Sequence, residues 1–140
     1  MKKILLTTGG TGGHVIPAEI IAEHLKDDYE INFSTDLRGH KYLKSNKNKI
    51  IIIDTPKLNL KFLFPFKFLK LFYLIFKSIF YLKKKKINKI ISTGGYMSLP
   101  VCIGGKFLGL KIYLLEPNLT LGRANKFFLN FCEKIFCYSE

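Results

Sequence analysis

Acidic residues are missing from a large part of this sequence. The chain has 10 Asp and Glu residues against 23 Lys and Arg, which gives a formal net charge of +13. No acidic residue lies between Thr55 and Leu115, whereas the same segment holds twelve lysines. Positive charge this concentrated indicates an anionic partner: a nucleic acid, a phosphorylated substrate or an acidic membrane surface.

Cysteine is scarce, and long apolar runs are missing. Cys102, Cys132 and Cys137 form no CxxC pair and are odd in number, which predicts reduced thiols in the cytoplasm rather than a disulfide framework. No stretch of 18 consecutive apolar residues occurs, which argues against a transmembrane helix. The apolar N-terminus is short and runs into glycines, so it predicts a strand rather than a signal peptide. With 48% hydrophobic residues, the 140-residue chain is expected to bury a core as one domain.

Short apolar segments alternate with helical ones along the chain. The segment 50–54 is rich in isoleucine and is expected to be a buried strand, and Pro17 is expected to open the first helix. The alternation predicts an α/β fold with a doubly wound, mostly parallel, Rossmann-like sheet. The expected strands are 2–8, 31–34, 50–54, 88–92, 111–115 and 134–138, and the expected helices are 17–26, 66–86, 99–108 and 122–131.

The first strand runs into a glycine loop, "TTGGTGGHVIPA". A strand, a glycine loop and a helix start together present free backbone N–H groups to an anion. The P-loop pattern fails because His14 and Val15 stand where Lys and Ser or Thr are needed, and G-x-G-x-x-G fails at Val15. The alternative is a tight turn without a ligand. His14 is a candidate general base or phosphate donor, and its alternative role is a polar helix cap.

Two later strands also end in polar or glycine-rich loops, "STGGYMSLP" and "LLEPNLTLGRAN". Ligands of doubly wound sheets bind outside the carboxyl ends of the strands. Because three separate loops reach the same rim, the sequence predicts a ligand cleft there.

The three motifs in this order resemble the N-terminal half of the MurG family over essentially the whole chain. The members of the MurG family are the UDP-N-acetylglucosamine:lipid I N-acetylglucosaminyltransferases of peptidoglycan synthesis, in glycosyltransferase family 28. The resemblance implies half of an inverting GT-B enzyme that uses UDP-N-acetylglucosamine and an undecaprenyl-diphosphate-linked acceptor. Residues 1–140 would be the acceptor and membrane-side domain, peripheral on the cytoplasmic face of the bacterial inner membrane, and the C-terminal donor domain would be absent.

The resemblance also implies roles for single residues. His14 would sit at the reaction centre as the base. Pro117 and Leu99 depart from the family pattern, in which glutamine and glycine are common at these positions. The implied donor contacts are Thr11, Gly12, Gly13 and Asn118, and the implied acceptor or phosphate contacts are Gly10, Gly94, Gly95, Tyr96, Glu116 and Asn125. No D-x-D motif and no metal-ligand spacing of Cys or His occurs, so no protein-bound metal or cofactor is expected.

The segment from Lys61 to Lys89 interleaves lysine with aromatic and aliphatic residues. On a helix, its lysines form a narrow stripe and the apolar residues cover too much of the surface to be buried in one small domain. This predicts an interfacial membrane helix; the alternative is a core helix with a solvated lysine tail. Nucleic acid is not expected, because the segment lacks arginine and its apolar run is too continuous for a stacking platform. The predicted membrane contacts are Lys67, Lys70, Phe72, Phe76, Lys77 and Phe80.

Two functional alternatives stay open. The chain can be a non-catalytic membrane or acceptor-binding subunit of a split glycosyltransferase, or part of a transferase for another lipid acceptor such as diacylglycerol. In each case, the isolated chain is expected to be inactive alone.

Overall fold

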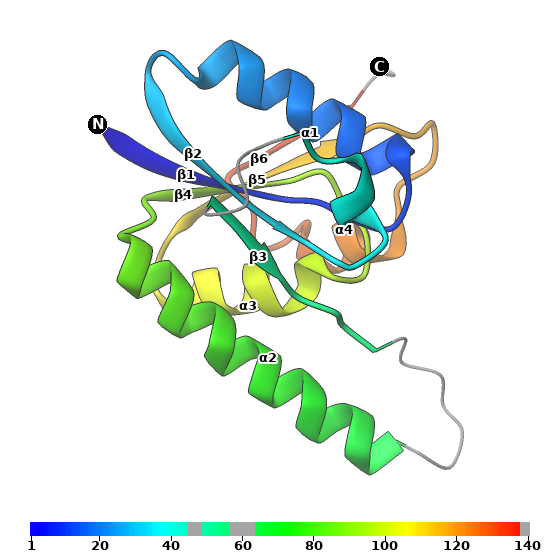
Figure 1. Cartoon of the computed structure of the whole chain (residues 1–140). Helices are drawn as coiled ribbons and strands as arrows, with labels where there is room; N and C mark the ends of the chain where they lie inside the picture. The colour runs from blue at the N-terminus through cyan, green and yellow to red at the C-terminus, as the bar shows by residue number, and fades with distance from the viewer. Residues whose placement is uncertain (45–48, 57–63, 138–140) are drawn as a thin grey trace.

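The computed structural model describes residues 1–44, 49–56 and 64–137. Within these residues, six parallel strands form one sheet in the order β3-β2-β1-β4-β5-β6 (Figure 1). The predicted doubly wound, Rossmann-like architecture is confirmed. The strands are β1 (Lys2–Thr7), β2 (Tyr29–Thr35), β3 (Ile50–Ile52), β4 (Lys89–Ser92), β5 (Lys111–Glu116) and β6 (Lys134–Cys137). The predicted end of the last strand, at 138, lies outside the described residues.

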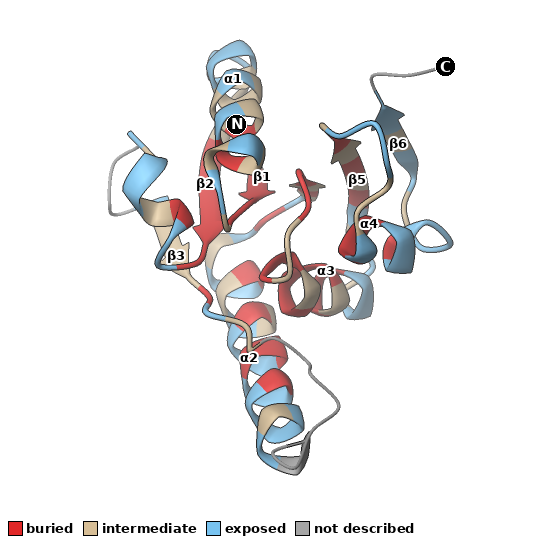
Figure 2. Cartoon of the chain, turned by 90° about the vertical axis from the view of Figure 1, so that its right-hand side faces the viewer, coloured by how far each residue is buried: buried red, intermediate tan, exposed pale blue. Residues whose placement is uncertain are grey.

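Helices cover both faces of the sheet (Figure 2). α1 (Gly12–Leu25) lies on one face, and α2 (Phe64–Lys85), α3 (Ser98–Phe107) and α4 (Arg123–Phe128) lie on the other. The strand order reverses between β1 and β4, because the chain returns from the β3 edge through α2. This reversal is the point at which doubly wound sheets bind their ligands.

Successive side chains of β1 point to opposite faces, which divides the core into two clusters. Ile4 and Leu6 pack with Phe33 under α1, whereas Leu5 packs with Ile90 and Leu114 on the side of α2 and α3. All six side chains are at most 2% exposed. The apolar strand sequences are therefore explained by burial on both faces, as is usual for parallel sheets.

Several predicted boundaries were wrong, and β2 begins at Tyr29 rather than at residue 31. α1 begins at Gly12, so Pro17 lies inside the helix rather than at its start; burial of Val15 and Ala18 on the sheet holds this helix across the proline. β3 ends at Ile52 and is a half-buried edge strand, because its pairing partner lies on one side only. α4 ends at Phe128 rather than at residue 131, where the N–H of residue 131 donates to the Phe128 carbonyl in a turn.

The long helix α2 has one packed face and one exposed face. Its buried face lies against α3, where a Cβ on Gly104 would lie 3.1 Å from the Ile79 side chain, so the two backbones approach closely. None of the helices in the described part of the chain has the length and apolar character needed to cross a membrane. The exposed side, which we call the aromatic face of α2, consists of Phe66, Leu69, Phe72, Tyr73, Phe76 and Phe80.

Candidate functional site

The loops that follow β1, β4 and β5 meet at one edge of the sheet. A Cβ on Gly95 would lie 3.2 Å from the backbone oxygen of Gly9, so the first two loops touch through their main chains. A Cβ on Gly94 would lie 3.3 Å from both the His14 ring and the Asn125 amide. Gly94 and Gly95 have φ values of +92° and +91°, a conformation that favours glycine. The three loops therefore form one continuous surface.

His14 is oriented by the second loop. Its Nδ1 lies 2.7 Å from the carbonyl oxygen of Thr93, and the Thr93 hydroxyl donates to the His14 backbone oxygen at 2.9 Å. A carbonyl oxygen can only accept, so the hydrogen is on Nδ1. In the neutral ring, Nε2 then carries the lone pair and can accept a proton. The contact thus selects the tautomer that a general base needs.

The buried carboxylate of Glu116 holds the third loop, which follows β5, through hydrogen bonds. It is 2% exposed, and its Oε1 accepts the backbone and side-chain N–H groups of Asn118 at 3.1 and 2.8 Å. Its Oε2 accepts the Gly122 N–H at 2.7 Å and the Asn125 amide at 3.1 Å. Burial alone would raise the pKa of the Glu116 carboxyl, but these four donors hold it below its usual range. The carboxylate therefore positions Asn118 and Asn125 rather than facing solvent.

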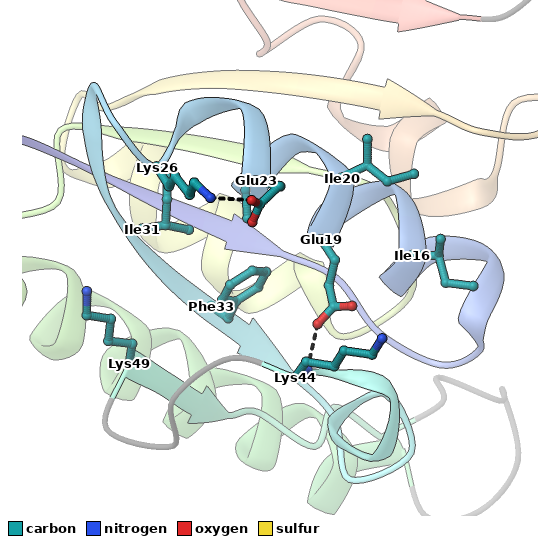
Figure 3. A pocket seen from close by; sticks show the side chains of 10 residues that line it. Ile16, Glu19, Ile20, Glu23, Lys26, Ile31, Phe33, Lys44 and Lys49 are labelled. Carbon is teal, nitrogen blue, oxygen red and sulfur yellow. Dashed lines mark hydrogen bonds and ion pairs between the residues drawn. The ribbon is translucent and has the colours of Figure 1, made fainter.

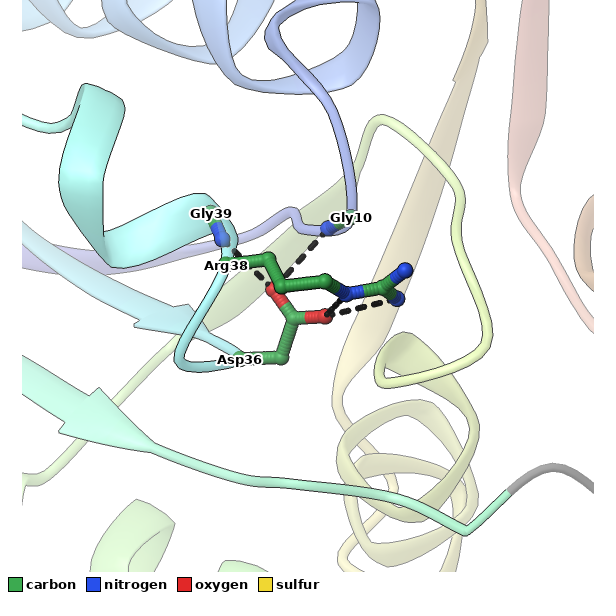
Figure 4. Close-up of polar contacts among 4 residues, drawn as sticks. All are labelled: Gly10, Asp36, Arg38 and Gly39. Atoms are coloured by element: carbon green, nitrogen blue, oxygen red, sulfur yellow. Dashed lines mark hydrogen bonds and ion pairs between the residues drawn. The ribbon is translucent and has the colours of Figure 1, made fainter.

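A second buried carboxylate, Asp36, was missed by the sequence reasoning. It follows β2 directly, is 4% exposed, and accepts the backbone N–H groups of Gly10 and Gly39 (Figure 4). It also accepts two bonds from the Arg38 guanidinium. Burial would raise the pKa of Asp36, but its hydrogen bonds and Arg38 lower it overall. In the sequence it is marked only as an acid directly after a short strand, YEINFST, in which polar and apolar residues mix.

A cavity of about 240 Å³ lies on the joined surface of the three loops. Gly10 and Thr11 in the first loop, and Gly12 and Gly13 at the start of α1, do not contribute to its lining. Arg123, in the first turn of α4, contributes to it and was also missed. The predicted residues that line it are His14, Gly94, Gly95, Tyr96, Glu116, Asn118 and Asn125.

A larger cavity of about 650 Å³ lies elsewhere, between α1 and the β2 side of the sheet. Figure 3 shows its isoleucine side chains and its charged rim, where Lys26 pairs with Glu23 and the Lys44 N–H donates to Glu19. None of the predicted site residues lines this cavity. Size therefore does not identify the site, whereas the convergence of strand ends does.

Among residues 1–44, 49–56 and 64–137, no cluster of three His, Cys, Asp or Glu side chains is arranged to hold a metal ion. The cavity on the three loops is instead lined by glycine backbone, the His14 imidazole, the amides of Asn118 and Asn125, and Arg123. Such groups bind anionic and hydroxylated ligands.

The family model described as "Glycosyltransferase family 28 N-terminal domain" matches residues 4–137. The chain belongs to this family. Relatives include a protein of Pelagibacter ubique (strain HTCC1062), 50% identical over 99% of this chain, and one of Rickettsia felis (strain ATCC VR-1525 / URRWXCal2), 41% identical over 96%. Both are named "UDP-N-acetylglucosamine--N-acetylmuramyl-(pentapeptide) pyrophosphoryl-undecaprenol N-acetylglucosamine transferase". The family resemblance predicted from the three motifs is confirmed.

This family 28 domain spans 39% and 37% of the length of those two relatives. Among solved structures, it is similar to MurG of Acinetobacter baumannii, with a TM-score of 0.84, 23% identity, and coverage of 98% of this chain and 41% of that one. It is also similar to UDP-N-acetylglucosamine 2-epimerase of Rickettsia bellii, with a TM-score of 0.70, 14% identity, and coverage of 100% and 40%. At these identities, the two structures establish the fold.

Proposed function

We propose that the chain is the acceptor-side part of a glycosyltransferase that moves N-acetylglucosamine from UDP to a lipid-linked muramoyl-peptide diphosphate. The observation that carries the proposal is the convergence of His14, Gly94 and Asn118 on one cavity in a family 28 domain. The names of the two relatives describe this transfer. The chain spans about two fifths of the length of these relatives. The proposal therefore includes a C-terminal donor-binding domain, in cis or in trans.

In the proposed reaction, the acceptor hydroxyl attacks the anomeric carbon of the donor sugar, and UDP leaves with the bonding electron pair. The hydroxyl proton passes to Nε2 of His14, which the Thr93 contact leaves with its lone pair. Backbone N–H groups at the start of α1, those of Thr11, Gly12 and Gly13, hold phosphate oxygens. Asn118 contacts the donor, and we assign Glu116 the role of positioning it.

The remaining predicted contacts belong to the acceptor side of the same proposal. The second loop brings Gly94, Gly95 and Tyr96 to the cavity, and Asn125 reaches it from α4. Gly10 shapes the first loop through its N–H bond to Asp36. These residues would fix the acceptor diphosphate so that its hydroxyl faces His14, which is a contribution of position rather than of chemistry.

A transfer assay tests this function. A chain carrying the C-terminal domain is incubated with radiolabelled UDP-N-acetylglucosamine and either lipid I or diacylglycerol. Label in the lipid I product supports the proposal, and label in diacylglycerol alone assigns another acceptor. Efficient transfer by residues 1–140 without a second domain would refute the division of labour. If the complete chain binds lipid I without transfer, the chain is instead a binding subunit.

We also propose that the aromatic face of α2 docks on an anionic membrane at the cytoplasmic surface. Phe76 and Phe80 are each 68% exposed, and Lys70 is exposed nearer the start of the same helix. Aromatic rings enter the acyl boundary while lysines meet anionic headgroups. The Lys77 ammonium donates to the Ile52 carbonyl at 3.2 Å, so in this structure it faces the domain. Lys67 is half-buried and Phe72 is exposed on the same helix.

Replacing Phe76 and Phe80 together with serine should weaken vesicle binding by about tenfold or more, since burying a phenylalanine side chain contributes about 1.5–3 kcal/mol. Lys70→Gln should remove about 1 kcal/mol, and this loss should shrink at high salt. Cosedimentation with phosphatidylglycerol-containing vesicles at low and high salt measures both effects.

The matched control is Phe136→Ser. Phe136 is 52% exposed and lies on the α1 side of the sheet, where it lines a groove with Ile4 and Ile21. This change should leave vesicle binding unaltered. An equal loss in the control, or full binding by the double variant, would exclude the aromatic face of α2 as the docking surface.

A further inference from the structure

The loop that follows β2 carries an arginine that no family motif above includes. Arg38 donates from Nε and Nη2 to Oδ2 of Asp36, at 3.2 and 3.1 Å. Its side chain is nevertheless 64% exposed, whereas that of Asp36 is 5% exposed. Asp36 therefore anchors one edge of the guanidinium (Figure 4), while most of the Arg38 side chain is exposed.

The anchor is shared with the first glycine loop. Oδ1 of Asp36 accepts the Gly10 N–H at 2.9 Å and the Gly39 N–H at 2.7 Å. Gly10 has a φ of +84°, and a Cβ on Gly39 would lie 3.0 Å from the Cα of Gly9. The loops that follow β1 and β2 thus pack backbone to backbone around the Asp36 carboxylate. This packing fixes the backbone at Arg38, and the bonds to Asp36 fix its guanidinium.

The guanidinium lies next to the first glycine loop. Its Nη2 is 3.9 Å from the position of a Cβ on Gly10. A guanidinium has five N–H donors, and Asp36 takes two, so three point elsewhere. Both oxygens of Asp36 are engaged by donors, so its charge is largely matched inside the domain. The remaining Arg38 donors suit the paired oxygens of a phosphate.

We propose that Arg38, positioned by Asp36, contacts a diphosphate group bound at the first glycine loop. This inference rests on the proposed function, which takes the first glycine loop as a diphosphate site. It adds the Arg38 side chain to the backbone N–H contacts proposed there. Asp36 is a positioning residue that acts through Arg38 and Gly10. The diphosphate can belong to the lipid acceptor or to the UDP donor, and the chemistry recognised is the same.

Titration calorimetry of residues 1–140 with inorganic pyrophosphate tests the contact. Arg38→Gln should weaken binding by about tenfold or more, because a charge-assisted bond to the anion is lost. Arg38→Lys should restore only part of the affinity, since lysine keeps the charge but not the forked geometry. Asp36→Asn should weaken binding although Arg38 is still present, which a charge effect alone would not produce.

The control is Lys26→Gln, which removes the same charge at the far end of α1, where Lys26 pairs with Glu23. Its affinity for pyrophosphate should equal that of the wild type. Arg38→Gln takes one partner from the buried Asp36 carboxylate, but the Gly10 and Gly39 N–H bonds to Asp36 remain and the glutamine amide can still donate. The variant should therefore still fold, which its melting temperature checks, and the result can be interpreted even if Asp36→Asn unfolds. Wild-type affinity in Arg38→Gln, or no pyrophosphate binding by the wild type, would overturn the inference.

Parallel titrations with UDP and with farnesyl diphosphate separate the two sources. A loss confined to farnesyl diphosphate assigns Arg38 to the acceptor, and a loss confined to UDP assigns it to the donor. Pyrophosphate binding needs no second domain or sugar transfer. An Arg38 effect in a chain that transfers no sugar therefore leaves this inference standing while the proposed function fails. Normal sugar transfer, together with wild-type pyrophosphate affinity in Arg38→Gln, would leave the proposed function standing and overturn this inference.

Discussion

Replacement of His14 by alanine in the complete enzyme is expected to lower the turnover number by about 10²- to 10⁴-fold, the range contributed by a positioned general base. Affinity for UDP-N-acetylglucosamine should change little, because the proposed role of the ring is to accept the acceptor proton. Steady-state transfer rates with lipid I, together with a donor titration, measure the two quantities separately.

The asparagine variant separates chemistry from structure at this position. The Asn amide can still donate an N–H bond toward the Thr93 carbonyl, which His14 Nδ1 now contacts at 2.7 Å. It has no nitrogen lone pair that can accept a proton. His14→Asn should therefore be as slow as His14→Ala while unfolding at the wild-type temperature. Recovery of the rate in His14→Asn would mean that the residue only ties the first loop to the second.

The glycine loops were predictable because their signals are local. Four glycines between residues 9 and 13 follow an apolar strand, and Gly94 and Gly95 follow another, so each loop is marked by its own neighbours. Their meeting at one edge follows from the parallel sheet alone. The left-handed φ values of Gly10, Gly94 and Gly95 show why glycine occupies these positions.

Asp36 could not be assigned from the sequence, because its role depends on a contact 26 residues away in the chain. Its carboxylate accepts the Gly10 N–H across the gap between β1 and β2. In the sequence, the same residue resembles any surface acid in a turn. The 3-10 helix η1 (Gly39–Tyr42) was also missed; bonds from the Gly39 and His40 N–H groups lead back to this same Asp36.

The strand 50–54 shows a second limit. A run of isoleucines predicts burial, but burial depends on the position of the strand in the sheet, which the local pattern does not contain. β3 lies at the edge, where Ile50, Ile51 and Ile52 are half-buried, and only Ile53 beyond the strand is buried. In α2, by contrast, the sequence already implied that one small domain cannot bury every apolar side chain.

Replacement of Glu116 by alanine is expected to lower the free energy of unfolding by about 3 kcal/mol, because it strips the acceptor from several buried N–H donors at once. The donors come from Asn118, Gly122 and Asn125, and Glu116 itself is 2% exposed. Urea unfolding at pH 7 measures the loss. Glu133→Gln is the matched control: Glu133 is exposed and 3.9 Å from Lys111, and an exposed pair contributes about 0–1 kcal/mol.

The pH dependence identifies the carboxylate as the source of this stability. Its pKa is lower in the folded state than in the unfolded chain, because its four N–H donors favour the charged form. Its contribution is therefore fully present above the unfolded-state pKa, about 4.3, and is lost as the pH falls through the folded-state pKa. The stability difference between the wild type and Glu116→Gln should be large at pH 7 and shrink below about pH 4. A difference that is constant across this window would show that packing, rather than the ionised carboxylate, holds the third loop.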